Sequence, residues 1–96
     1  MRWALMLGLL VLASPAGAQP VPGWMKPGPG QEATAIGCAT CHTPDYIRMN
    51  SVFLTPDLWK AEVAKMRQAF GAPIDDDSAK QILTYLDANY AVAPKQ

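Results

Sequence analysis

The sequence predicts an all-α protein with one small domain. Two segments carry apolar residues at helical spacing between recognisable helix starts and ends, and no segment shows the alternation of a β-strand. A length of 96 residues sets a ceiling of one domain, and no internal repeat is visible. We expect about three helices around a single core.

Residues 1–18 have the pattern of a secretory signal peptide. Arg2 supplies positive charge, residues 3–13 are apolar, and residues 16–18 (AGA) match a small-residue cleavage site. A membrane anchor is the alternative, but the apolar run covers only half of the roughly 20 residues that a span needs, and Pro15 interrupts the segment. We expect cleavage after residue 18, export to the periplasm and no membrane span in the mature chain.

The charge balance argues against a nucleic-acid partner. Loss of Arg2 with the signal reduces eight basic side chains to seven, against eight acidic ones. A nucleic-acid-binding protein would need a clear basic excess.

Residues 19–30, QPVPGWMKPGPG, read as a Pro/Gly-rich arm or linker, because proline and glycine both disfavour helix. A folded domain is then expected over residues 31–96. Its first helix is predicted from about residue 31 to residue 42, with Glu32 complementing the positive end of the helix dipole and Thr43-Pro44 ending it. Residues 44–54 show no sustained period and are predicted to be a loop.

A second helix is predicted over residues 56–70. Thr55 suits the N-cap, Pro56 the first helical position and Gly71 the residue past the end. Its apolar residues recur at i, i+4, i+7 and i+11, which predicts one buried face. These residues are Trp59, Val63, Met66 and Phe70.

A third helix is predicted after Asp75, a suitable N-cap. Ile74 and Ala79 have the spacing of a hydrophobic staple, and Pro94 prevents continuation of the helix. The expected buried stripe consists of Ala79, Ile82, Leu83, Leu86 and Tyr90.

The segment Cys38-Ala39-Thr40-Cys41-His42 is the attachment pattern for c-type haem. Two residues between the cysteines allow both sulfurs to form thioethers, and the adjacent histidine faces the iron. A thioredoxin-like pair would normally lie near a βαβ pattern, which is missing from this sequence, and a zinc site would need about four ligands. We therefore expect one covalent haem c held by Cys38 and Cys41, with His42 as an iron ligand.

The second axial ligand separates an electron carrier from a ligand-binding haem protein. The chain has no second histidine, so methionine is the leading candidate. Met66 is preferred, with Met49 or an open position as alternatives, because Met49 lies only seven residues after His42. Methionine and histidine together raise the reduction potential. Arg48 and Arg67 are candidate partners for the haem propionates or, equally, part of a solvated face.

From Cys38 onward the chain resembles class I monohaem cytochromes c, and most closely the cytochrome c subunit of bacterial sulfite dehydrogenases. The resemblance is carried by CATCHTPDYI, by WKAEVAKM, by FGAPI and by QILTYLDANY. It implies a small cytochrome c-like fold with its N-terminal and C-terminal helices in contact, and a distal methionine before the last helix.

The resemblance also implies a role and partners. In this family the haem accepts single electrons from a molybdenum-cofactor subunit that oxidises sulfite and passes them to a downstream cytochrome or oxidase. This chain is then expected to be an electron-transfer subunit and not itself an enzyme. There are two alternatives. One is a freely diffusing carrier for other periplasmic dehydrogenases, and the other is a haem enzyme or sensor with an open distal position.

Overall fold

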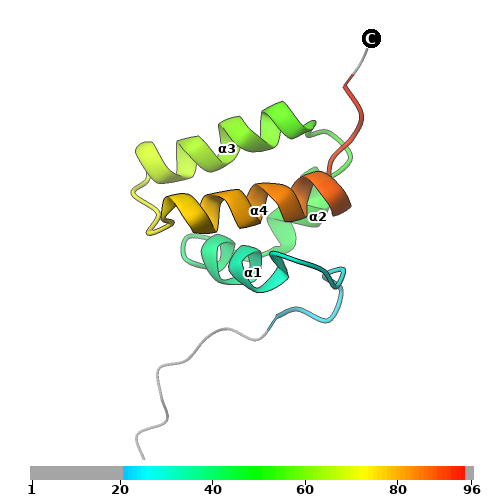
Figure 1. The fold of residues 1–96 in the computed structure, drawn as a ribbon, viewed down its shortest axis with the longest axis horizontal. Coiled ribbons are helices and arrows are strands. Elements are labelled where there is room, and N and C mark those ends of the chain that lie inside the picture. Colours follow the sequence, from blue (N-terminus) through cyan, green and yellow to red (C-terminus); the bar gives the residue numbers. More distant parts are fainter. Residues whose placement is uncertain (1–20, 95–96) are drawn as a thin grey trace, which may run out of the picture.

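Four α-helices account for the regular structure of residues 21–94, the part of the chain that the computed structural model describes (Figure 1). The predicted signal peptide, residues 1–18, lies outside the described residues. Across residues 21–94 there is no β-strand, which confirms the all-α prediction. The helices are α1 (Gln31–Ala39), α2 (Asp45–Asn50), α3 (Pro56–Gln68) and α4 (Asp76–Asn89).

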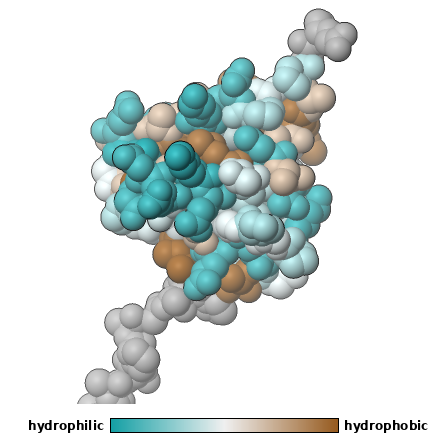
Figure 2. All heavy atoms as spheres, viewed as in Figure 1, coloured by the Kyte–Doolittle hydropathy of each residue, from teal (hydrophilic) through white to brown (hydrophobic). Residues whose placement is uncertain are grey.

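The last helix, α4, is the centre of the arrangement. It packs against α1 on one side and against α3 on the other, so that α3, α4 and α1 lie in succession in Figure 1. The view in Figure 2 shows mostly hydrophilic side chains over α3 and α4, with hydrophobic ones between these two helices, near the C-terminal end and at the edge where α1 lies. The helices are therefore amphipathic, as their sequence patterns predict.

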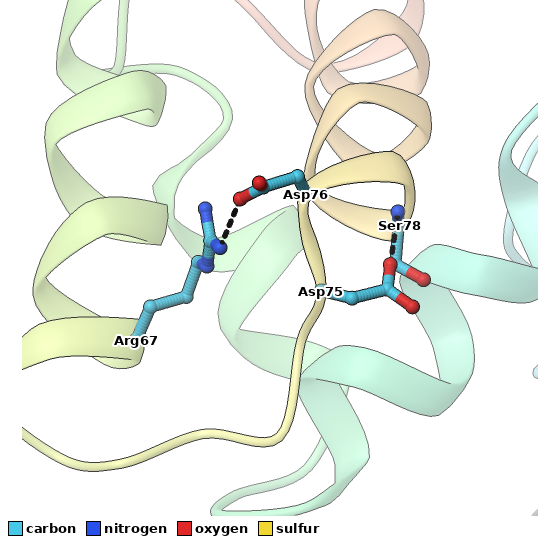
Figure 3. Close-up of polar contacts among 4 residues, drawn as sticks. All are labelled: Arg67, Asp75, Asp76 and Ser78. Carbon is cyan, nitrogen blue, oxygen red and sulfur yellow. Dashed lines mark hydrogen bonds and ion pairs between the residues drawn. The ribbon is translucent and has the colours of Figure 1, made fainter.

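The starts of α3 and α4 follow the predicted capping chemistry. Thr55 Oγ1 accepts a hydrogen bond from the Leu58 amide, and an Asp75 carboxylate oxygen accepts one from the Ser78 amide at 2.7 Å (Figure 3). These bonds satisfy amides that have no partner inside the helix. The Ser78 amide also holds the pKa of the Asp75 carboxyl below its usual value.

The close crossing of α1 and α4 depends on Gly30. This residue has a φ of +89°, and a Cβ atom there would collide with the backbone oxygen of Gln81. Beside it, the buried hydroxyl of Thr34 donates to the Gly30 carbonyl oxygen at 2.7 Å. A side chain at position 30 would therefore force the two helices apart.

Three predicted boundaries or burial assignments were wrong. The first helix ends at Ala39, not residue 42, and the chain turns over residues 40–42 before Pro44. Residues 45–50 form helix α2, not a loop, and this turn and a half is too short to give a periodic pattern. Phe70 is 64% exposed, because α3 ends at Gln68 and the chain turns through Gly71, whose φ is +66°.

The described part of the Pro/Gly-rich segment packs onto the C-terminal part of the bundle. Met25 is 3% exposed and belongs to the core, and the Trp24 and Tyr90 rings meet edge to face. The backbone of Lys26 donates to the Tyr90 hydroxyl and accepts from the Tyr85 hydroxyl. Tyr85, which the predicted stripe omitted, is fully buried because this segment covers it.

None of the helices within residues 21–94 has the length and apolar character needed to cross a membrane.

The packing of Met25 predicts its effect on stability. Met25→Ala should lower the free energy of unfolding by about 2–5 kcal/mol, because it removes a buried side chain from a filled core. Met49, which is 69% exposed, provides the matched control, and Met49→Ala should change stability by no more than about 0.5 kcal/mol. Urea titration of the purified proteins measures both. Equal stability of the two variants would show that the segment before α1 does not contribute to the core.

Candidate functional site

An apolar pocket enclosed by all four helices contains the predicted site residues. It has about 500 Å³ of empty space, counting its open mouth. Cys38, Cys41, His42 and Met66 all line it, although Met66 is 24 positions from His42 in the sequence.

The CATCH segment reaches the pocket through the end of α1. Cys38 lies in the last turn of α1, and Cys41 and His42 lie in the turn that follows Ala39. Next to Cys38, Gly37 faces α4 so closely that a Cβ atom would lie 2.9 Å from the Ile82 Cδ1 atom. The packing of α1 on α4 therefore places the attachment segment at the pocket.

Both cysteines are free thiols in this structure. Cys38 is partly buried, and burial raises the pKa of its thiol to about 11, whereas Cys41 is exposed. A reactive dithiol centre needs at least one thiol whose pKa is lowered by positive charge or a helix N-terminus. Cys38 instead lies at a helix C-terminus, where the dipole disfavours a thiolate.

The His42 ring is oriented by two neighbours. Its Nδ1 atom lies 3.2 Å from the Thr43 carbonyl oxygen, and its ring centroid lies 4.9 Å from that of Tyr46. Since a carbonyl oxygen can only accept, the contact is a hydrogen bond in the tautomer that protonates Nδ1. In that tautomer Nε2 keeps its lone pair, which is the arrangement of a metal-binding histidine.

The three described methionines have different surroundings. Met66 is half-buried on α3 and lines the pocket with His42. Met49 lies on α2 and is 69% exposed, and it is not among the residues that line this pocket. Met25 is buried in the core. The geometry therefore brings Met66, and not Met49, to the pocket that holds His42.

The sequence analysis missed Glu62 as a pocket residue. Its carboxylate accepts a hydrogen bond from the Tyr46 hydroxyl at 3.0 Å and pairs with Lys65 Nζ at 2.9 Å. Burial and the neighbouring Glu62 carboxylate together raise the pKa of Tyr46. Glu62 lies four residues before Met66, and this i, i+4 spacing puts both on one face of α3. The same spacing was visible in the sequence.

Neither arginine that was considered for the haem propionates lines the pocket. Arg48 pairs with Asp45 at 2.8 Å and lies over the Trp24 ring. Arg67 pairs with the exposed Asp76 at 2.6 Å and so connects the end of α3 to the start of α4 (Figure 3). Exposed pairs of this kind contribute at most about 1 kcal/mol.

Comparison with protein families, with curated proteins and with solved structures finds no match to this chain.

Proposed function

We propose that this protein is a small exported c-type cytochrome that carries one electron at a time. Cys38 and Cys41 would hold haem c through thioether bonds, and His42 and Met66 would be the axial ligands of its iron. The observation that carries the proposal is that these four side chains line one apolar pocket. An attachment motif alone would not require the methionine to lie there.

The residues of the pocket fit this prosthetic group. Both thiols are free to form thioethers, His42 can offer Nε2, and Met66 supplies a thioether sulfur. The remaining walls are largely apolar, with contributions from Ile47, Val63, Ile74, Ile82 and Leu86. When bound, haem c supplies reversible one-electron chemistry at iron. The apolar walls would keep water from it, and a Met66 ligand would favour the ferrous state.

The helix arrangement supports a cytochrome c-like fold. The resemblance noted above implies contact between the first and last helices and a methionine ligand before the last helix. Here α1 packs on α4, and Met66 lies on α3, directly before α4 in the chain. The short helix α2, which contributes Ile47 and Tyr46 to the pocket, makes four helices within residues 21–94 instead of the expected three.

The proposed role is that of an electron-accepting subunit in a periplasmic sulfite-type dehydrogenase. The chain itself would carry no substrate site, because the closed ligation by His42 and Met66 leaves the iron no position for substrate. A molybdenum-cofactor subunit would oxidise sulfite, and a downstream cytochrome or oxidase would receive the electron. The support is the family resemblance from Cys38 to Tyr90 together with this pocket.

Met66→Ala tests the distal ligand. The variant should keep its covalent haem but lose the weak sulfur-to-iron charge-transfer absorption of the ferric state, because no thioether would face the iron. Met49→Ala is the matched control and should keep the band. Loss of the band in Met49→Ala, with an unchanged band in Met66→Ala, would assign the ligand to Met49.

Sulfite turnover tests the partner. The dehydrogenase that co-purifies with this chain should reduce its haem when sulfite is added, and the reduction should be seen by absorption spectroscopy within one turnover. Addition of sulfite to the isolated cytochrome should produce no reduction. If the complex oxidised sulfite without reducing the haem, the proposed role would be contradicted. If no large partner co-purified with the chain, a freely diffusing carrier would be favoured.

A further inference from the structure

Helix α2 makes no close backbone contact with the other three helices, and it packs against them through side chains. In the described residues, no Cα atom of α2 lies within 8 Å of one in α1, α3 or α4. Ile47 anchors α2 by full burial in the core. Apart from the connection through residues 51–55, side-chain contacts therefore set how α2 packs against α3.

A single hydrogen bond joins α2 to α3 among residues 21–94, from the Tyr46 hydroxyl to Glu62 Oε1 at 3.0 Å. Glu62 is itself restrained, since its other carboxylate oxygen lies 2.9 Å from Lys65 Nζ and its side chain is 18% exposed. Both Tyr46 and Glu62 line the pocket. The bond thus spans the space between two pocket walls.

Each end of this bond lies next to one of the two proposed iron ligands. The Tyr46 ring lies against the His42 imidazole, with centroids 4.9 Å apart and planes inclined by 41°. Glu62 lies one helical turn before Met66 on the same face of α3. Any widening between α2 and α3 would therefore separate the wall at His42 from the wall at Met66.

We propose that the Tyr46–Glu62 hydrogen bond is a clasp that keeps Met66 opposite His42, with Tyr46 and Glu62 as positioning residues. The inference rests on the proposed function, because it concerns retention of an axial ligand. While the bond is present, the wall at His42 and the wall at Met66 can separate only if the bond breaks. Without it, α2 would have no polar connection to α3 in the described part of the chain, and Met66 would be held less firmly as an iron ligand.

Carbon monoxide binding to the ferrous haem protein measures this opening. At saturating carbon monoxide the observed rate equals the rate at which Met66 dissociates. Tyr46→Phe and Glu62→Ala should each raise that rate roughly tenfold, as expected for loss of one hydrogen bond to a charged acceptor. Glu62→Gln retains an acceptor oxygen and should stay closer to the unmodified protein than Glu62→Ala.

Two controls distinguish a clasp from a general contribution to stability. Lys65→Met removes the ion pair but leaves the Tyr46–Glu62 bond, and it should leave the rate within a factor of two. Met25→Ala weakens the core at a residue that does not line the pocket and should also leave the rate unchanged. A rise in both controls equal to that in Tyr46→Phe would overturn the clasp.

Haem content and the sulfur-to-iron band separate loss of the clasp from loss of the proposed ligation. Unchanged carbon monoxide rates in Tyr46→Phe and Glu62→Ala, with the sulfur-to-iron band present in every protein, would overturn the clasp and leave the electron carrier standing. An unmodified protein with no covalent haem, or with haem but no such band, would overturn the proposed ligation from which the clasp is inferred.

Discussion

The crossing of α1 over α4 is the constraint on which the rest of the structure depends. Gly30 allows the start of α1 to approach the Gln81 backbone, and Gly37 allows its end to approach Ile82. Cys38 follows Gly37 directly, so this close contact places the attachment segment against the pocket. Helix α3 then packs on the other side of α4 and brings Met66 to the same pocket. The proposed site is thus a consequence of two helix contacts with one central helix.

Because the domain is small, contacts other than those between the helices matter for its stability. Residues 21–94 form a domain of the size whose core by itself gives only about 3–5 kcal/mol of stability. Residues 21–30 extend that core, because Met25 is buried and the Lys26 backbone bonds to two tyrosine hydroxyls of the C-terminal part. Trp59 adds a further connection by donating from Nε1 to the Tyr90 carbonyl oxygen at 2.9 Å. A covalently attached haem would tie α1 to the turn after it and fill the pocket at the same time.

Local chemistry was predictable from the sequence, whereas contacts between distant segments were not. Thr55, Pro56 and Asp75 marked the helix starts, because capping depends on neighbouring residues. Tyr85 fits the period of the buried stripe, since it lies three residues after Ile82, but the bond from its hydroxyl to the Lys26 carbonyl, 59 positions away, is reported by no pattern. For the candidate site, the CATCH motif and a preference for Met66 could be drawn from the sequence. The Tyr46–Glu62 bond could not, since α2 is too short for a periodic signal.

Covalent attachment of haem to Cys38 and Cys41 is the central claim, and the mass of the purified protein tests it most directly. The purified chain should retain its absorption after extraction with acidified organic solvent, and its intact mass should exceed that of the polypeptide by one haem. Cys38→Ala/Cys41→Ala should lose both properties. A bare polypeptide whose two thiols are free or joined in a disulfide would contradict the account.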